Sequence, residues 1–349
     1  MNSKDIPRSE SALESVERFH ATLMGNWKTQ VLYVAASLRI ADLLASGPRT
    51  SAELARATST HPAALHRLLR ALSTIDVCQE RDGGSFELTA FGALLQEKSP
   101  HSQRAWTIWW GQHLWPVWEH LLYSVRTGDS ARKMLSGTEG FAHLEQDPEA
   151  AALFNKAGVE QLQLTAPDIV RTYDFGSQPR VVDIGGGHGV LLLTVLKAHP
   201  GATGVLFDLA HAIEGARRYV DESGLADRCE LVRGDFFQSV PRGGDVYILK
   251  SVIHDWDRER SLRILQNCRK AMEPDARLLV IEPIVPERLG TSLADQAIAR
   301  SDLTMLIAHA AQERTEAEFR ELLNASGFEV SRLLAAGAGF TIIEARPRE

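Results

Sequence analysis

Five short apolar runs, rich in β-branched residues, recur from residue 180 onward, and helical patterns lie between several of them. The runs cover residues 180–184, 202–208, 229–235, 245–250 and 277–283. Strands that alternate with helices form a parallel sheet, because each helix returns the chain to the same end of the sheet. The sequence therefore predicts a Rossmann-like α/β domain with helices on both faces. Residues 328–347 contain two strand-like segments around a Gly-rich turn and predict a terminal antiparallel hairpin.

The first third of the chain has a helical pattern instead. Residues 14–47 carry apolar side chains at helical spacing. Residues 49–89 follow as helix, turn, helix and two short strands around an Asp-Gly-Gly turn, which is the outline of a winged helix. We predict three parts: an N-terminal helical, winged-helix-like domain at 1–96, a polar linker at 97–104, and a larger domain at 105–349 whose segment 105–175 is helical.

Charge and cysteine content exclude several classes of protein. The net charge of −7 is opposite to that of a typical nucleic-acid binder. The three cysteines are scattered and lack CxxC spacing, so neither a disulfide framework nor a zinc site is expected. The N-terminus lacks the apolar core of a signal peptide, and no apolar run approaches the roughly 20 residues of a membrane span. We expect a cytoplasmic protein.

A glycine-rich turn follows the first predicted strand, in the sequence VVDIGGGHG at 181–189. Ligands of open α/β sheets bind at the carboxyl ends of the strands, and this turn belongs to that edge. The dinucleotide fingerprint GxGxxG/A is incomplete, because counting from Gly185 leaves Val190 at the last position. On its own, such a sequence is equally compatible with a plain tight turn.

Acidic residues close the next two strands. Asp208 lies twenty-three residues after Gly185, where a carboxylate suits the two hydroxyls of a ribose. Asp235 can accept from an exocyclic amine, and Phe236 can lie against a purine face. Both acids could instead be helix N-caps. Because the turn contains no Lys or Arg for phosphate, the three strand ends together predict an adenosine without phosphates.

Six motifs carry a family resemblance. They are VVDIGGGHG, FDLAH, GDFF, YILKSVIHDWDRERSLRIL, LLVIEPIVP and QERTEAEF. Together they resemble the S-adenosylmethionine-dependent O-methyltransferases of the caffeate and acetylserotonin type, especially bacterial members that modify mitomycins, anthracyclines and phenazines. The resemblance spans nearly the whole chain. It implies a class I methyltransferase domain, S-adenosyl-L-methionine as methyl donor with S-adenosyl-L-homocysteine as product, and a homodimer. Ala210 replaces the family's usual proline.

The resemblance also implies roles for individual residues. His254 is the implied general base, with Glu282 and Glu313 beside it, and Lys250 contacts the cofactor. A structural alternative is that Glu313, with Glu316, caps the next helix around Thr315. The predicted cofactor-binding residues are Asp183, Gly185, Gly187, Asp208, Leu209, Gly234, Asp235, Phe236 and Lys250.

An aromatic cluster begins after the predicted linker, where five of the seven tryptophans lie. At helical spacing it could be plain core, but the resemblance places the acceptor chamber here, and flat side chains suit a planar aromatic ligand. The predicted substrate residues are Trp106, Trp110, His113, Phe154, Asn155, Asp255, Asp302, Met305 and His309.

The sequence thus predicts an enzyme that methylates a phenolic hydroxyl of a small aromatic or polycyclic secondary metabolite, phenazine- or polyketide-like, without a metal. Two alternatives remain. One is a ligand-sensing transcription regulator with a degenerate methyltransferase domain, because the N-terminal helices resemble a DNA reader. The other is N-methylation on the same fold. We expect a homodimer that binds neither nucleic acid nor membranes.

Overall fold

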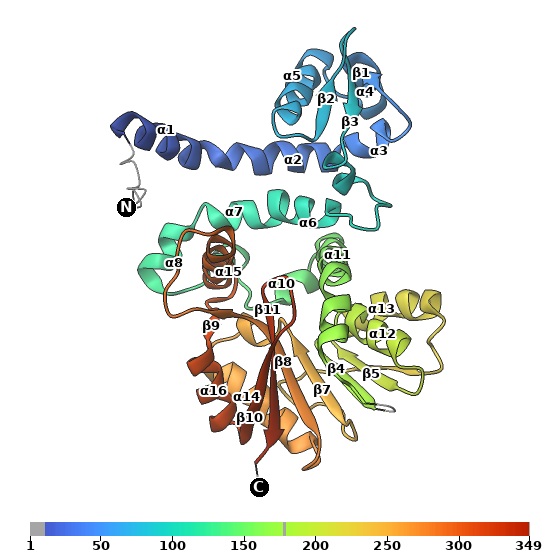
Figure 1. Cartoon of the computed structure of the whole chain (residues 1–349), viewed down its shortest axis with the longest axis vertical. Helices are drawn as coiled ribbons and strands as arrows, with labels where there is room; N and C mark the ends of the chain where they lie inside the picture. The colour runs from blue at the N-terminus through green and yellow to red at the C-terminus, as the bar shows by residue number, and fades with distance from the viewer. Residues whose placement is uncertain (1–10, 177–178, 349) are drawn as a thin grey trace, which may run out of the picture. The chain divides into compact units, whose positions relative to one another are not determined.

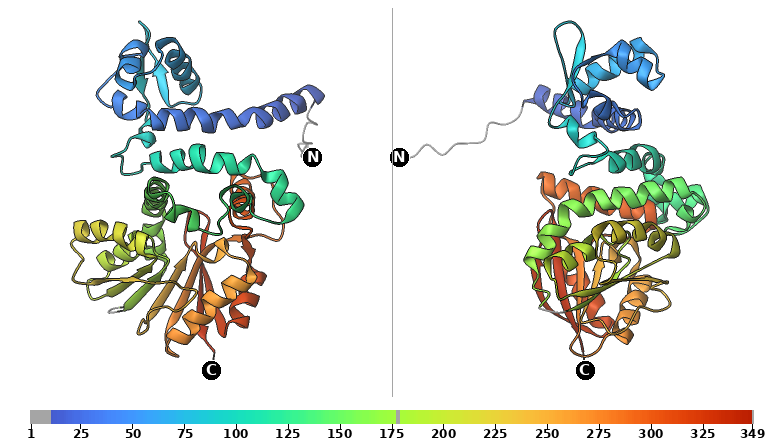
Figure 2. Two further views of the ribbon diagram at one scale, coloured as in Figure 1. Left: turned by 180° about the vertical axis from the view of Figure 1, so that it is seen from behind. Right: turned by 90° about the vertical axis from the view of Figure 1, so that its right-hand side faces the viewer.

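The computed structural model describes residues 11–176 and 179–348. The chain divides into two compact units, and the division lies after Gln112. Figures 1 and 2 show the first unit in blue to teal and the second in green to red. Among the described residues, none of the helices combines the length and the apolar character that a membrane span requires.

The first unit consists of short helices and a small sheet. Its elements are α1 (Ala12–Leu23), η1 (Met24–Asn26), α2 (Trp27–Ser37), α3 (Ile40–Leu44), β1 (Arg49–Thr50), α4 (Ser51–Thr58), α5 (Pro62–Ser73), β2 (Cys78–Glu80), β3 (Ser85–Leu88), η2 (Gly92–Leu95) and α6 (Arg104–Ile108). Helix α4 starts at a capping box of Thr50 and Glu53, and α5 starts at Pro62, whose missing N–H is unneeded there. The predicted helix, turn, helix and two strands are present, and β1 adds a third strand in the order β1-β3-β2.

The first unit extends beyond residues 97–104, where the sequence placed the linker. Arg104 Nε donates to the carbonyl oxygen of Ala36 in α2 at 3.0 Å. Gly111 packs so tightly on α2 that a Cβ there would lie 2.2 Å from the Cβ of Tyr33. These contacts hold residues 104–112 against the first unit, so the two units separate after this segment.

The second unit contains the mixed sheet. Its strands are β4 (Arg180–Ile184), β5 (Thr203–Asp208), β6 (Cys229–Arg233), β7 (Val246–Lys250), β8 (Arg277–Val285), β9 (Arg314–Thr315), β10 (Phe328–Ala335) and β11 (Phe340–Pro347). The order is β10-β11-β8-β7-β4-β5-β6, with β9 paired to β8. Strands β4 to β8 run parallel, and β11 joins β8 antiparallel. The Rossmann-like sheet and the terminal hairpin are confirmed.

Two hydrophobic cores cover the two faces of this sheet, because successive strand residues point to opposite sides. Val182 and Tyr247 belong to the core with α14 (Arg258–Ala271) and α16 (Glu316–Ala325). Val181 and Val246, one residue earlier, belong to the core with α12 (Val190–Ala198) and α13 (Ala210–Ser223). Figure 1 shows these two pairs of helices on either side of the sheet.

The remaining helices of the second unit belong to the segment after its start and to the β8–β9 connection. They are α7 (Trp115–Trp118), α8 (Leu121–Thr127), α9 (Ala131–Ser136), α10 (Ala142–Glu145), α11 (Pro148–Thr172) and α15 (Leu293–His309), and the π-helix η3 (Trp109–Leu114) precedes α7. Ser130 Oγ, at the start of α9, donates to the carbonyl oxygens of Ile307 and Ala308 in α15. This contact fixes α9 against the end of α15.

Candidate functional site

The glycine turn after β4 is hydrogen-bonded to the end of β5. The Gly187 N–H donates to Asp208 Oδ2 at 2.8 Å, and the Leu209 N–H donates to Asp208 Oδ1 at 2.6 Å. The N-cap position of α13 is Leu209, which makes no side-chain capping bond. Asp208 is therefore not a helix cap; it joins two strand ends at the carboxyl edge.

Bare backbone is required at this turn for steric reasons. Gly185 has a φ of +68°, which favours glycine, and a Cβ there would meet Val252 Cγ2 at 3.0 Å. A Cβ at Gly186 would lie 2.6 Å from Asp183 Oδ2. A side chain at Gly185 would therefore crowd the loop after β7, and one at Gly186 would collide with side chains of β4 and β5.

Asp183, which is buried, and Lys250, which is half-buried, are ionisable groups near the ends of β4 and β7. Within the described part of the chain, Asp183 Oδ2 has no hydrogen-bond partner. Burial, and then the charge of Asp208, raises the pKa of Asp183 to about 7. Burial lowers the pKa of Lys250 to about 8, although Glu282 and Asp183 oppose the change. Lys250 Nζ lies 4.2 Å from the ring centroid of Phe340.

The third strand end carries Gly234, Asp235 and Phe236. A Cβ at Gly234 would lie 2.3 Å from Phe207 Cε2, so only glycine fits there. Asp235 Oδ1 accepts from the Phe237 N–H at 2.8 Å, a local turn rather than a helix cap. The Phe236 ring is half-buried and lies 6.0 Å from the ring of Trp256.

His254 lies in the 3₁₀ turn η4 (Ile253–Asp255), directly after β7. Ser251 enters this turn with a φ of +52°, an unusual conformation for a residue with a side chain. Glu282 of β8, fully buried, accepts from the N–H groups of Val252 at 3.0 Å and Ile253 at 2.9 Å through Oε1. The neighbouring strand thus holds the turn by its backbone.

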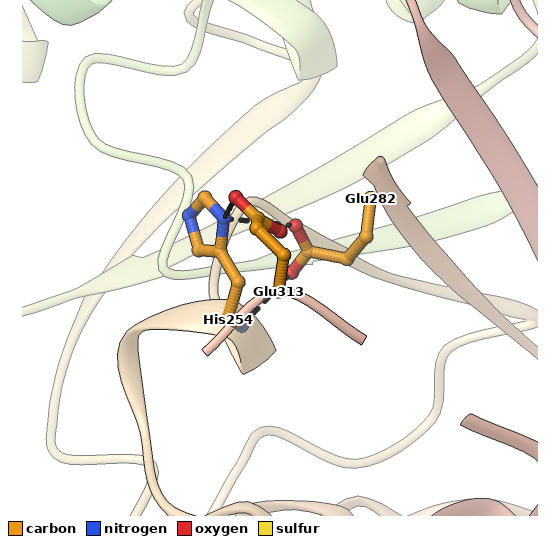
Figure 3. Close-up of side chains that lie close together, drawn as sticks. All are labelled: His254, Glu282 and Glu313. Carbon is orange, nitrogen blue, oxygen red and sulfur yellow. Dashed lines mark hydrogen bonds and ion pairs between the residues drawn. The ribbon is translucent and has the colours of Figure 1, made fainter. Parts of the chain in front are cut away.

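Two glutamates meet one ring nitrogen of His254. His254 Nδ1 lies 3.0 Å from Glu313 Oε1 and 3.5 Å from Glu282 Oε2. Figure 3 shows both carboxylates at Nδ1, with Nε2 turned away from them. Glu313 is held in turn, because Ser301 Oγ donates to its Oε1 at 2.7 Å and Asp302 Oδ1 accepts from its N–H at 2.9 Å.

The capping alternative for Glu313 does not describe this chain. The capping box at the start of α16 is formed by Thr315 and Glu318. Glu313 lies before the cap and turns its side chain to His254 instead.

The electrostatics of His254 follow from these carboxylates. Burial by itself lowers the pKa of His254, but the negative charges of Glu282, Asp255 and Glu313 outweigh burial and raise that pKa to about 10. Burial raises the pKa of Glu313, but the His254 charge and hydrogen bond, with Ser301, reverse the change and lower it. His254 is therefore an imidazolium at neutral pH.

Asp255 and His309 lie on the other side of the imidazole. Asp255 Oδ1 lies 3.7 Å from His254 Nε2 and 3.7 Å from His309 Nε2. Burial raises the pKa of Asp255 to about 7, and the cations His254 and Arg132 oppose the change. Burial and the charge of Arg132 keep the pKa of His309 well below its usual range, so His309 is neutral.

An aromatic cluster centred on Phe141 adjoins His309. The Phe141 ring lies 4.8 Å from His309, 5.5 Å from Phe154 and 6.2 Å from Trp256 between centroids. The structure thus brings Asp255, His309 and Phe154 of the predicted substrate set together near His254.

The other predicted substrate residues are more dispersed. Trp106 and Trp110 belong to the first unit, with ring centroids 6.0 Å apart. Asp302 contacts Glu313 rather than His254. His113, Asn155 and Met305 are half-buried in the second unit.

Five residues of the site were not predicted from the sequence. They are Arg132, Phe141, Trp256, Ser301 and Arg314. Ser301 and Arg314 adjoin Asp302 and Glu313 in the chain, so inspecting the neighbours of the predicted residues could have found them. Nothing in the sequence marks Arg132 or Phe141, whose positions depend on how the helical segment before α11 folds.

His254, Glu282 and Glu313 also place one possible ligand atom each within 4.8 Å of one another, a spacing compatible with a metal ion. The atoms concerned already pair with one another, and the second oxygen of Glu282 is bound by backbone N–H groups. These contacts favour an ion-paired cluster.

Family comparisons agree with this fold. The sheet and the helical N-terminal unit are those of a class I methyltransferase with a dimerisation domain. Residues 118–329 match the model of the O-methyltransferase domain, and residues 21–98 match that of the O-methyltransferase dimerisation domain. The chain therefore belongs to the O-methyltransferase family of enzymes.

Individual relatives cover nearly the whole chain. Phenazine O-methyltransferase PhzM of Lysobacter antibioticus is 42% identical over 325 residues, 93% of this chain and 94% of the relative. Mitomycin biosynthesis 6-O-methyltransferase of Streptomyces lavendulae is 39% identical over 344 residues, 97% of each. An 8-amino-8-demethylriboflavin N,N-dimethyltransferase of Streptomyces davaonensis is 38% identical over 323 residues, 90% of this chain and 91% of the relative.

Solved structures are similar over the same extent. The crystal structure of LaPhzM has a TM-score of 0.92 and 41% identity, and covers 97% of this chain and 100% of its own. CalO1, a methyltransferase in calicheamicin biosynthesis solved in its SAH-bound form, has a TM-score of 0.79 and 35% identity with the same coverage.

Proposed function

We propose that the enzyme transfers a methyl group from S-adenosylmethionine to a phenolic hydroxyl of a small aromatic or polycyclic secondary metabolite. The observation that carries the proposal is the position of His254, paired with Glu313 and Glu282 at the carboxyl edge that also holds the glycine turn. Relatives named for phenazine and mitomycin methylation support the substrate class.

The residues at the glycine turn fit an adenosyl sulfonium donor. The Asp208 carboxylate has lone pairs left for ribose hydroxyls after its two backbone bonds. The Asp183 carboxyl, whose Oδ2 has no hydrogen-bond partner among the described residues, and the Lys250 ammonium are ionisable groups suited to the amino and carboxyl groups of the donor. When bound, the donor supplies an electrophilic methyl carbon on sulfur.

We assign His254 as the general base, acting through Nε2 while Glu313 holds Nδ1–H. A phenol has a pKa of about 10, and an unperturbed imidazole has one of about 6.5, so transfer between them is uphill by roughly 5 kcal/mol. The carboxylates remove most of this cost, because they bring the pKa of His254 to about 10. The corollary is that His254 is mainly protonated at pH 7, so the neutral base is the minor form.

Orientation supplies the rest of the rate. The acceptor oxygen must lie about 3 Å from the methyl carbon and in line with the bond to sulfur. The rings of Phe141, Phe154 and Trp256 offer flat apolar surfaces for a planar acceptor, and Asp255 and His309 offer polar contacts beside it.

N-methylation is the second candidate, and the N,N-dimethyltransferase relative favours it. An aromatic amine attacks through its lone pair and needs no base before the transfer. Pairs of acceptors that differ only in OH or NH₂ on the same ring separate the two reactions. With labelled S-adenosylmethionine and mass spectrometry, we expect methyl transfer to the hydroxyl members. Transfer to the amines alone would overturn the proposal, and a chelator should leave the O-methylation rate unchanged.

We also propose that the N-terminal domain, residues 1–96, forms a homodimer. Helix α1 buries none of its residues, and Leu13, Val16 and Leu23 are each about half or more exposed. An amphipathic helix of this kind needs an apolar partner surface. The match to a dimerisation-domain model supports a second copy as that partner. Size-exclusion chromatography with light scattering at micromolar concentration should give twice the chain mass, and a monomer would refute it.

A further inference from the structure

A buried arginine binds the backbone of the turn that carries His254. Arg314 of β9 is 4% exposed. Its guanidinium donates to the carbonyl oxygen of Ile253 at 2.8 Å, to that of Trp256 at 2.7 Å and to Ser261 Oγ at 3.2 Å. The two carbonyls lie on either side of His254 and Asp255, so this one side chain spans the turn.

Glu282 binds the same turn as a hydrogen-bond acceptor, whereas Arg314 binds it as a donor. Its Oε1 accepts from the Ile253 N–H, while Arg314 binds the Ile253 carbonyl. Both ends of one residue's backbone are therefore bound by buried groups of opposite charge. Charge-assisted bonds of this kind are stronger than neutral ones. They can maintain the left-handed Ser251 that starts the turn, a conformation that persists only where its surroundings enforce it.

Arg314 directly follows Glu313, and the two side chains bind different parts of the His254 turn. Neighbouring side chains of an extended segment point to opposite sides. Glu313 reaches the imidazole, whereas Arg314 reaches the backbone on which that imidazole stands. Figure 3 shows the orientation of the imidazole in which both glutamates lie at Nδ1.

We propose that Arg314 is a positioning residue, which fixes the 253–256 turn so that His254 Nδ1 stays between Glu313 and Glu282. It acts through the backbone and makes no contact with the reacting atoms. The other groups that face His254 are Asp255 on its own turn and His309 on α15. Replacing Arg314 leaves each of these side chains in the sequence but removes a cation that interacts with Glu282 and Glu313. Loss of that cation would by itself raise the pKa of His254, so a fall in the pKa reports a change in the position of the ring.

The chain offers a matched control. Arg228 also binds several carbonyl oxygens, those of Leu196, His199, Pro200 and Ala202, at the start of β5 and therefore at the opposite edge of the sheet. Arg228→Ala removes a comparable set of hydrogen bonds without touching the turn. A loss of stability alone should appear equally in both variants.

The primary experiment is an NMR pH titration of the imidazole signals, with His254→Gln used to assign the His254 signal among the twelve histidines. We expect Arg314→Ala to lower the titration midpoint of His254 by about one pH unit or more, because the ring leaves its carboxylates. Arg314→Lys keeps the charge but loses the planar guanidinium that can bind two carbonyls at once, so the midpoint should shift less. Arg228→Ala should leave the midpoint unchanged. An unchanged midpoint in folded Arg314→Ala, or in Arg314→Lys if the alanine variant does not fold, would overturn the proposal.

A kinetic experiment adds a second readout, and this part rests on the proposed function. Arg314→Ala should lower kcat for a phenolic acceptor about 10- to 100-fold, with the KM for the donor within about twofold of wild type. Arg228→Ala should keep its kcat. Equal losses of kcat in the two variants would also overturn the proposal. If the wild type methylates no hydroxyl, only the proposed function fails, because the titration needs no acceptor.

Discussion

Neutralising Glu313 tests the electrostatic account of His254 most sharply. Glu313→Gln keeps the size and one oxygen that can accept from Nδ1–H, but it removes a negative charge 3.0 Å from that nitrogen. At an effective dielectric constant of 20, two unit charges at this distance attract by about 5 kcal/mol. Opposite charges at such short range change pKa values in proteins by about 1–3. We therefore expect the pKa of His254 to fall by about 1–3 in this variant.

The pH profile of kcat/KM with a phenolic acceptor reports the change. The base must be neutral, so the wild-type rate should rise with pH toward the His254 pKa of about 10. In Glu313→Gln the rising limb should move to lower pH by the same amount, about 1–3 pH units. The plateau rate should also fall, because a weaker base abstracts the proton less readily. Glu316→Gln is the control, since Glu316 is exposed and pairs with Arg320. A limb that stays in place in an active Glu313→Gln enzyme would refute the reasoning.

Three further predictions concern the same site. His254→Ala should lower the methylation rate about 10²- to 10⁴-fold, with donor affinity by calorimetry unchanged; near-normal turnover would remove His254 as the base. Gly185→Ala should weaken donor binding about tenfold or more, because its φ of +68° strains alanine and the new methyl lies 3.0 Å from Val252; wild-type affinity would contradict the close-approach argument. The folded-state pKa of His254 lies above its ordinary value, so its stabilising contribution is complete below about pH 6.5 and is lost as pH rises toward about 10. Urea unfolding across that range should show stability falling with pH, and His254→Gln should flatten the slope.

The strand pattern and the strand-end residues were accessible from the sequence, because both follow from local composition. Apolar runs of five to seven residues predicted β4 to β8, and parallel strands bring their carboxyl ends to one edge. The proximity of Asp208 to the glycine turn could therefore be predicted without any knowledge of side-chain geometry. The alternatives of helix caps and plain turns were separated only by the hydrogen bonds.

Other features depend on tertiary packing that no local pattern encodes. Glu313 lies fifty-nine residues from His254, and only the family resemblance paired them. The limit of the first unit depends on the fit of Gly111 against Tyr33. The hydrogen bonds from Arg314 to two carbonyls depend on the path of the 253–256 turn. The polar sequence at 313–315 would fit an exposed loop equally well, so it does not predict these bonds.

Calorimetric titration with S-adenosylmethionine and with S-adenosylhomocysteine bears most directly on the whole account. Wild-type protein should bind both, and Asp208→Asn should bind at least about tenfold more weakly, since an amide cannot accept from the Gly187 and Leu209 N–H groups and two hydroxyls together. Glu230→Gln, an exposed change on neighbouring β6, should bind like wild type. Folded wild-type protein that gives no binding heat with either ligand would contradict the assignment of the carboxyl edge.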